Sequence, residues 1–349
     1  MAQNRIYENK ILWEADALYS HHRIPGAVVT ERGTLIVYCE ARTACSDWAL
    51  MDILMQRSTD GGISFEPPIW LCEGTIRHNT VNNPVMIVGQ GGVLHLLYCV
   101  DYTVRGGGIH YRRSTDDGLT WSVPRDLSMA CRPEFHQVLA PGPGHGLCLQ
   151  NGVLIAPVWM VPTSAGVPLD AHMPSVLTTI YSPDGGDTWR MGELVPDAPS
   201  VPSPNETSLA QLSDGRVMLN IRNAPGKRAV SFSDNGYSGW TVPRLHPDLT
   251  DPGCYGGMAQ VREANGVTLY FANCNDPQKR RNVTLWESGN EGADWTPMCI
   301  DPDNGGYVDV AADPSRNMLY LLYEVRGGQQ MRLARLSLHA PQTDVRNAR

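Results

Sequence analysis

The sequence has no apolar run approaching the roughly 18 residues that a membrane-spanning helix needs. Its first stretch, MAQNRIYENKILWEADALY, lacks the basic segment and apolar core of a secretory signal. Long stretches of helical periodicity are also missing, which disfavours a helical bundle. We therefore expect neither a membrane protein nor a mainly helical one.

Paired cysteines are missing as well. The nine cysteines are odd in number and scattered, and no Cys-x-x-Cys pair occurs among them. This spacing fits neither a disulfide framework nor a zinc site, and it predicts free thiols in a reducing compartment. Together with the missing signal segment, it predicts a cytoplasmic protein, with a secreted protein as the alternative. We also predict no metal, because no residues are spaced like a ligand set, and no organic cofactor.

Positive charge is in short supply. Lys and Arg number 28 against 36 Asp and Glu, which leaves a formal net charge of −8. This balance argues against nucleic acid or an anionic membrane as a partner, although it permits a local basic pocket. Hydrophobic residues make up 42% of the chain and charged residues 18%, so we expect a sizeable core and no extended disorder.

A short motif, Ser-x-Asp-x-Gly-x-Thr/Ser followed by an aromatic residue, recurs along the chain. Its three full copies carry Asp60, Asp116 and Asp184, a fourth has Asn290 in that place, and SFSDNGYSGW is a fifth whose spacing is off by one residue. The copies start at residues 58, 114, 182, 233 and 288. Such motifs, called Asp boxes, have the composition of a hairpin turn and are predicted to be structural.

Six short β-rich runs accompany these turns, each opened by Gly or Asn. They read GTLIVYCE, GGVLHLLYC, GVLIAPVW, GRVMLNIR, GVTLYFANC and NMLYLLYE. One run for every roughly 40–60 residues matches the blade of a β-propeller. We predict an all-β fold, a single six-bladed propeller domain over residues 1–349, with blades from about 15 to 335 and short extensions at both ends.

The order of the segments resembles that of the exo-α-sialidases (neuraminidases) of glycoside hydrolase family 33. An Arg-Ile-Pro segment, a Glu-x-Arg strand and Ser-Asp precede the first Asp box. Further segments that resemble the family follow in its order, namely NETSLAQLSDGRVMLNIRN, DPGCYGGMAQV, QKRRNVTLW and GGYVDVAADPSRNMLYLLYE. Tyr255 stands where the family usually has Gln. The resemblance covers about residues 15–325.

The resemblance implies that Arg23, Arg222 and Arg280 bind the carboxylate of the substrate. Guanidinium groups form bidentate, charge-assisted hydrogen bonds that lysine does not match. Arg281 is the alternative third arginine, although the family pattern R-x-x-L/V-T favours Arg280. Glu324 is implied to orient Arg23, and clustered cations need such an acidic neighbour.

The resemblance also implies that Tyr307 is the nucleophile and that Glu206 is its base. The carboxylate of a sialoside repels an anionic nucleophile, and a neutral phenol avoids this repulsion. A phenol has a pKa of about 10, so it needs a base in order to attack.

Asp47 matches the position of the family's acid/base. That role calls for a raised pKa and a partly dry environment, which we expect the neighbouring Trp48 to supply. Asp52, the rival carboxylate, lies in the apolar run ALMDILMQ and is predicted to be structural. Arg42, in the segment EAR, either contacts the sugar or braces a loop.

These residues predict a retaining exo-α-sialidase that hydrolyses terminal sialic acids from glycans through a tyrosyl-enzyme intermediate. The same site would serve another nonulosonic acid, transfer to a second sugar, or internal attack that yields an anhydro product. The distant alternative is a glycan-binding propeller without chemistry, which has no reason to keep Asp47, Glu206 and Tyr307 together.

Overall fold

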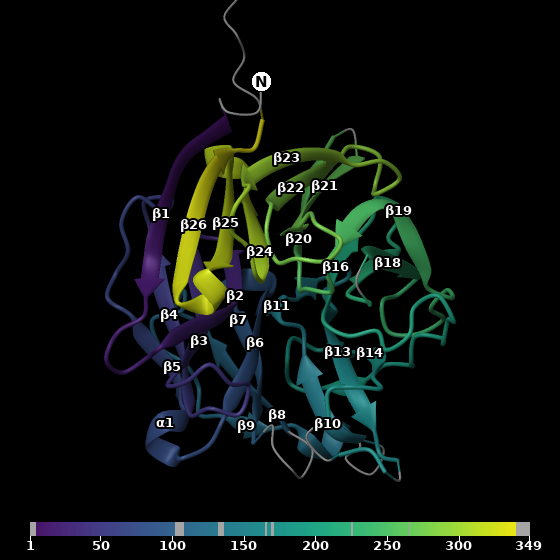
Figure 1. Ribbon diagram of the computed structural model, residues 1–349, viewed down its shortest axis with the longest axis horizontal. Coiled ribbons are helices and arrows are strands. Elements are labelled where there is room, and N and C mark those ends of the chain that lie inside the picture. The colour runs from purple at the N-terminus through teal and green to yellow at the C-terminus, as the bar shows by residue number, and fades with distance from the viewer. Residues whose placement is uncertain are drawn as a thin grey trace, which may run out of the picture.

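Six sheets of four or five strands are arranged around an axis as the blades of a β-propeller (Figure 1). The computed structural model describes residues 5–101, 108–131, 136–164, 166–168, 171–224, 226–264 and 266–339. The six-bladed propeller predicted from the sequence is confirmed.

Each β-rich run of the sequence forms the second strand of a blade. These strands are β3 (Leu35–Arg42), β7 (Leu94–Val100), β13 (Leu154–Pro162), β17 (Val217–Ile221), β21 (Gly266–Cys274) and β25 (Met318–Val325). Every residue of β3 and of β25 is buried. Because neighbouring blades cover both faces of a second strand, the strand is a mostly apolar run rather than an alternation of apolar and polar residues.

Each second strand pairs with an inner strand that faces the axis. The inner strands are β2 (His21–Val29), β6 (Val81–Val88), β10 (His136–Pro141), β16 (Thr207–Gln211), β20 (Gly257–Glu263) and β24 (Val308–Asp313). Strand β24 contacts both β2 and β20, and β2 also contacts β6, so strands far apart in the sequence meet at the axis.

The outer half of each blade consists of a third and a fourth strand. The third strands are β4 (Met51–Ser58), β8 (Gly108–Ser114), β14 (Val176–Ser182), β18 (Gly226–Ser233), β22 (Val283–Ser288) and β26 (Gln330–Ser337). The fourth strands are β5 (Ile69–Glu73), β9 (Arg125–Asp126), β15 (Arg190–Met191), β19 (Arg244–Asp251), β23 (Thr296–Asp301) and β1 (Ile6–Glu14). The remaining elements are short: β11 (Gly144–His145), β12 (Leu147–Cys148), α1 (Gly74–Arg77), η2 (Gln90–Gly92), η3 (Ser128–Cys131), η5 (Pro314–Arg316) and η6 (Arg326–Gly328).

The Asp boxes are the turns that follow the third strands of the first five blades. In the second blade the Ser114 hydroxyl donates to Asp116 at 2.8 Å, and Asp116 accepts the backbone N–H of Thr120 at 2.9 Å. In the fifth copy of the sequence Asn235 takes the place of the aspartate, because its Oδ1 accepts the backbone N–H groups of Tyr237 and Ser238, each at 2.9 Å. The Gly236 N–H bonds to the Ser233 hydroxyl three residues before it, rather than four as in the other copies, and this explains the irregular spacing.

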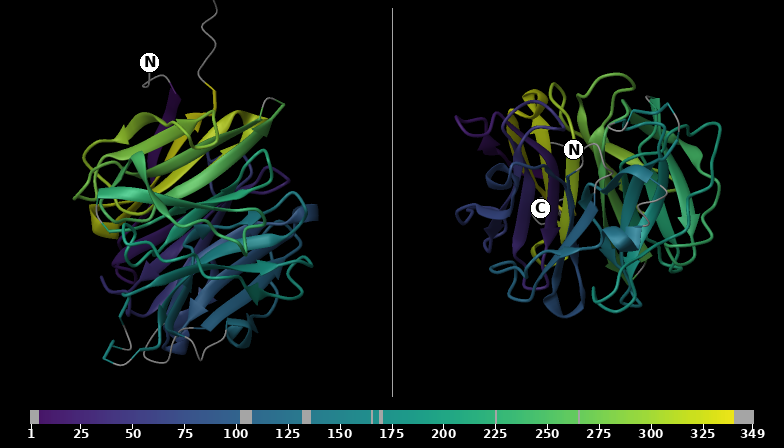
Figure 2. Two further views of the ribbon diagram at one scale, coloured as in Figure 1. Left: turned by 90° about the vertical axis from the view of Figure 1, so that its right-hand side faces the viewer. Right: turned by 90° about the horizontal axis from the view of Figure 1, so that it is seen from below.

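The sixth blade contains strands from both ends of the described chain. Strand β1 pairs antiparallel with β26, from Ile6 opposite Leu336 to Glu14 opposite Gln330. The right-hand view of Figure 2 shows the purple N-terminal strand beside the yellow C-terminal strands. Residues 6–14 therefore belong to a blade and do not form the expected N-terminal extension. The charged residues of this segment obscure the strand in the sequence. Strand β1 is an outer edge strand, and its side chains are mostly exposed or half-buried.

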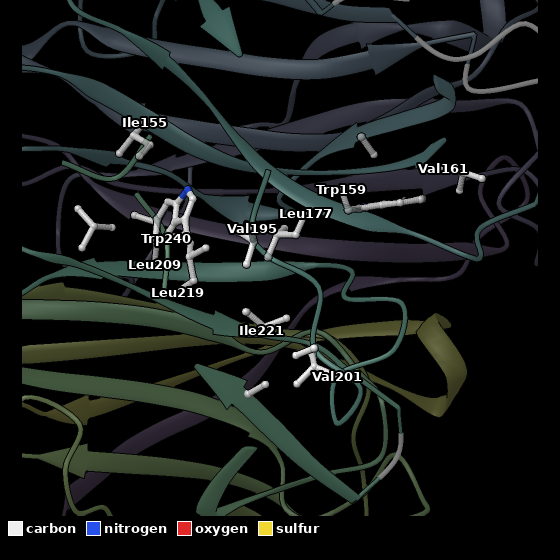
Figure 3. Close-up of a cluster of buried hydrophobic side chains, with 14 of the residues drawn as sticks. Ile155, Trp159, Val161, Leu177, Val195, Val201, Leu209, Leu219, Ile221 and Trp240 are labelled. Atoms are coloured by element: carbon white, nitrogen blue, oxygen red, sulfur yellow. The ribbon is translucent and has the colours of Figure 1, made fainter. Parts of the chain in front are cut away.

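Large apolar clusters fill the spaces between blades. In one of them Trp159 and Leu177 of the third blade pack with Leu219 and Trp240 of the fourth (Figure 3). Burying such a side chain fully contributes roughly 1.5–3 kcal/mol. All nine cysteines are free thiols, as their spacing predicts. No helix in the described ranges is long and apolar enough to cross a membrane.

Candidate active site

A cavity of about 500 Å³ lies where the inner strands begin. Seven of the eight predicted site residues line it, namely Arg23, Arg42, Asp47, Glu206, Arg222, Arg280 and Tyr307. The eighth, Glu324, is only 2% exposed and lies behind Arg23. The topology thus brings together predicted residues from four different blades.

Glu324 orders the part of the site where the first and sixth blades meet. Its carboxylate accepts Arg23 Nε at 3.2 Å, the backbone N–H of Ile24 at 2.9 Å and that of Tyr307 at 3.1 Å. Ile24 has a φ of 59°, a left-handed conformation that is strained for a β-branched residue. Gly306 leaves room for the carboxylate, since a Cβ there would lie 2.5 Å from Glu324 Oε2. The sequence prediction that Glu324 orients Arg23 agrees with these contacts.

Arg222 connects the predicted nucleophile to the predicted base. Its Nη1 donates to the carboxylate of Glu206 and, at 2.7 Å, to the hydroxyl of Tyr307. Both Glu206 and Tyr307 are buried, at 5% and 6% exposure. Among the described residues, no direct hydrogen bond joins Glu206 to Tyr307. In the free protein the Arg222 guanidinium bonds to both groups in place of the direct contact expected between the base and the nucleophile.

Arg280 lies in the cavity and Arg281 does not. The Arg280 guanidinium is 5.3 Å from the centre of the Tyr307 ring. Arg281 instead pairs with Asp276 at 2.7 Å, and its side chain is 55% exposed. Gly305 packs against the backbone of both arginines, because a Cβ there would lie within 3.0 Å of each.

Tyr307 is surrounded by positive charge. The guanidinium groups of Arg23 and Arg222 lie 5.1 and 5.8 Å from the centre of its ring, which is close to the 5.3 Å distance of the Arg280 guanidinium. Burial raises the pKa of the Tyr307 hydroxyl well above its usual range, and the carboxylate of Glu206 adds to the rise. The three guanidinium groups act in the opposite direction. The phenol is therefore neutral in the free protein and has three cations ready to stabilise a phenolate.

Asp47 has a different environment from the one its sequence predicts. Arg42, which is 2% exposed, donates from Nη1 to Asp47 at 2.6 Å and from Nε to the fully buried Glu40 at 2.8 Å. Burial raises the pKa of Asp47, but Arg42 outweighs this, and the net effect lowers that pKa below its usual range. The expected raised pKa is thus wrong for the free protein. Of the two roles considered for Arg42, bracing the loop is the one the contacts support.

Trp48 and Asp52 both lie away from the cavity lining. The Trp48 ring packs against the imidazole of His172, with 5.6 Å between ring centroids. Asp52 accepts the hydroxyl of Tyr19 and, at 2.9 Å, the backbone N–H of Thr75 at the start of α1. Asp52 is therefore structural, as its place in an apolar run predicts.

Several other residues that line the cavity were not predicted. Among them are the polar residues Asn82, Asn83 and Asn205 and the ring-bearing residues Trp159 and His172. No motif marks these residues in the sequence. The one available signal is their position: the first two lie at the start of inner strand β6, and Asn205 directly precedes Glu206.

A buried polar group forms the floor beneath Tyr307. Tyr255 lies 5.8 Å from the Tyr307 ring, and its hydroxyl is 3.5 Å from Asp309. Asp309, which is fully buried, also accepts the backbone N–H of Ala27 at 3.0 Å and contacts His145 Nδ1 at 2.9 Å. Tyr255, in the place of the usual Gln, belongs to this floor rather than to the cavity lining.

Comparison with known proteins gives a family, a curated relative and solved structures that resemble this chain. Residues 74–309 match the family of BNR repeat-like domains. A curated sialidase of Bacteroides fragilis is 27% identical over 339 residues, which cover 86% of this chain and 59% of that protein. This chain thus spans less than two thirds of that relative's length.

Two solved structures share the fold. The Hadza microbial sialidase Hz136 superimposes with a TM-score of 0.78 at 24% identity, covering 91% of this chain and 66% of that one. A Trypanosoma rangeli sialidase, in a complex with 2,3-difluorosialic acid described as a covalent intermediate, gives a TM-score of 0.74 at 17% identity. That comparison covers 95% of this chain and 58% of the other.

Proposed function

The chain belongs to the BNR repeat-like family and to the sialidase superfamily, and on that premise we propose that it is a retaining exo-α-sialidase. It would release terminal sialic acids from oligosaccharides or glycoconjugates. One observation supports this more than any other: Arg222 contacts both the Glu206 carboxylate and the Tyr307 hydroxyl inside a cage of three guanidinium groups. A site that only binds glycans needs the arginines but not the buried tyrosine and its base.

Binding of the substrate carboxylate prepares the chemistry. Arg23, Arg222 and Arg280 hold the carboxylate by charge-assisted hydrogen bonds, which places the anomeric carbon over the Tyr307 hydroxyl. An anion bound at Arg23 also lies near Asp47, since Arg23 Nη1 and Asp47 are 3.7 Å apart. A nearby negative charge raises the pKa of a carboxylic acid. The substrate thereby helps to protonate the acid that its own cleavage requires.

The first step transfers the sugar to the protein. The Tyr307 oxygen bonds to the anomeric carbon as the glycosidic bond breaks, Glu206 takes the phenolic proton, and Asp47 gives a proton to the departing oxygen. The three arginines stabilise the negative charge that develops on the phenol oxygen. For this step Glu206 has to exchange its contact with Arg222 for one with Tyr307, a rearrangement that the incoming carboxylate favours by competing for Arg222.

The second step returns the site to its starting state. The Asp47 carboxylate takes a proton from water, and the hydroxide bonds to the anomeric carbon as the bond to Tyr307 breaks. Glu206 gives its proton back to the phenol. Two displacements at one carbon retain its configuration, so the product expected is the α-anomer of the free sugar.

A fluorogenic α-sialoside assay tests the proposal. We expect the wild type to turn over the substrate and Tyr307→Phe to lose roughly 10³-fold in kcat. Tyr323→Phe is the matched control, because Tyr323 is buried in the same blade and its hydroxyl bonds to Asn9, away from the cavity. No turnover by the wild type on α-glycosides of either N-acetylated or deaminated nonulosonic acids would sink the enzyme claim. Product analysis separates hydrolysis from transfer and from anhydro-sugar formation.

A further inference from the structure

A further arginine, Arg228, lies behind the site and does not line the cavity. It extends from strand β18 and is fully buried. Its Nε and Nη2 donate to Asn220 Oδ1 at 2.7 Å and to the Asn220 carbonyl at 2.8 Å. Asn220 lies in β17, two residues before Arg222. One edge of the guanidinium therefore holds the strand end that carries Arg222.

The other edge of Arg228 holds the neighbouring blade. Its Nη1 donates to the carbonyl of Cys254 at 2.7 Å. Cys254 directly follows Pro252 and Gly253, which line the cavity, and it packs in a small buried cluster with Tyr307. The same side chain thus fixes a cavity wall and a packing partner of the proposed nucleophile.

Asp251 completes this connection. It lies 3.7 Å from Arg228 Nη1, and its Oδ1 accepts the backbone N–H groups of Gly253 and Cys254, each at 2.8 Å. Its Oδ2 accepts Asn273 Nδ2 at 2.8 Å. The segment from Asp251 to Cys254 is therefore held from both sides by a buried ion pair.

A buried ion pair contributes little to stability, because removing both charges from water costs free energy. Burial lowers the pKa of Arg228, which reflects the cost of keeping the charge away from water. Apolar residues of similar volume often replace buried ion pairs without loss of stability. Arg228 also adds a positive charge beside Arg222. The pair instead fixes the geometry of the two blades, because a planar guanidinium with three bonded partners allows only one arrangement of them.

We propose that Arg228 is a positioning residue that sets Arg222 and the Pro252–Cys254 wall relative to Tyr307, and so sets the affinity of the site for the substrate carboxylate. This inference rests on the proposed sialidase function. It predicts an effect on binding rather than on the fraction of folded protein.

The test compares Arg228→Lys and Arg228→Met with Arg57→Lys. Arg57 is a matched control, because it is also buried and donates to the Asp117 carbonyl at 3.0 Å and to Glu66 at 2.6 Å, on the outer half of the first blade. KM and kcat are measured on the fluorogenic sialoside, Kd with an unsaturated sialic acid analogue, and Tm by calorimetry. Both Arg228 variants should raise KM and Kd about ten- to a hundredfold with a smaller loss in kcat. Arg57→Lys should lower Tm and leave KM and Kd unchanged.

A lower kcat at unchanged KM and Kd in the Arg228 variants would overturn the inference, since partial unfolding reduces only the number of active sites. Asp251→Asn serves if those variants do not fold, because an asparagine keeps the oxygen that accepts from Gly253 and Cys254. It should raise Kd above that of the wild type, and an unchanged Kd counts against the inference. A wild type that neither binds the analogue nor cleaves the sialoside overturns the proposed function itself.

Discussion

On the rim of the propeller, Asp60, Asp116 and Asp184 each accept the backbone N–H of the residue four positions later, at 2.8–3.0 Å. At the axis, hydrogen bonds span far more of the chain. Glu324 and Arg23 are 301 residues apart in the sequence, and Arg222 and Tyr307 are 85 apart. The rim repeats one local turn, whereas the axis assembles side chains that occur once each.

This difference separates stability from chemistry. A turn that closes its own hydrogen bonds works in any blade, so the protein repeats it. A catalytic group has to meet partners from other blades, so the polar residues near the starts of the inner strands differ from blade to blade. We therefore expect axis substitutions to change turnover and rim substitutions to change unfolding.

The largest effect is expected at Asp47. Asp47→Asn should lower kcat/KM for a sialyl-lactose by roughly 10²–10⁴-fold and for an aryl sialoside by much less, because only the sugar leaving group needs a proton. Since the free-protein pKa of Asp47 lies below its usual range, wild-type kcat/KM on the sialyl-lactose should fall as pH rises from the acid range. An equal loss on both substrates would remove Asp47 from the acid role.

A smaller effect is expected at Glu324. Glu324→Gln keeps the length of the side chain but removes the charge that pairs with Arg23, so KM should rise about tenfold while Tm changes little. Steady-state kinetics and thermal unfolding measure the two quantities. A fall in Tm at constant KM would mean that Glu324 stabilises the fold and does not orient Arg23 for substrate binding.

On the rim, Asp116→Ala should destabilise the fold by about 0.5–1 kcal/mol and leave kcat/KM unchanged. The donors of Thr120 lower the pKa of Asp116 to about 2. The stabilisation is therefore present above the unfolded pKa of about 4 and is lost as pH falls through the folded value. Denaturant unfolding of wild type and variant at pH 7 and pH 2 checks both points, and a change in kcat/KM would contradict the division between rim and axis.

The smallest effect concerns His145 below the cavity floor. Burial lowers the pKa of His145, but Asp309 outweighs this and raises it above its usual range. The stabilisation is thus fully present below the unfolded pKa of about 6.5 and is lost as pH rises through the folded value. The difference in Tm between wild type and His145→Gln should shrink between pH 5.5 and pH 9. A constant difference would mean that only the neutral imidazole matters.

The fold was predictable because its signals are local. Each Asp box closes within a few residues, and each second strand is a mostly apolar run, so both stand out in the sequence. Strand β1 (Ile6–Glu14) was missed for the opposite reason: it is an outer edge, it has no box of its own, and its partner lies more than 300 residues away.

Individual site residues, and the contact of Glu324 with Arg23, were predicted through ordered family segments, whereas the other contacts among them were not. The segment EAR does not indicate that Arg42 pairs with Asp47. This contact helps to lower the pKa of Asp47, which was expected to be raised. Arg228 lacks any motif, because its role depends on the positions of Asn220 and Cys254 in two different blades. Contacts between blades form only when the six blades close into a ring, so no single stretch of sequence predicts them.

The most direct test of the account is to trap the sugar on the protein. The wild type is incubated with 2,3-difluorosialic acid, whose fluorine at carbon 3 slows the second step, and the digested protein is mapped by mass spectrometry. We predict one sugar adduct on the peptide that contains Tyr307 and none in Tyr307→Phe. An adduct on Glu206 or Asp47 would contradict the tyrosyl intermediate and the roles assigned to all three residues.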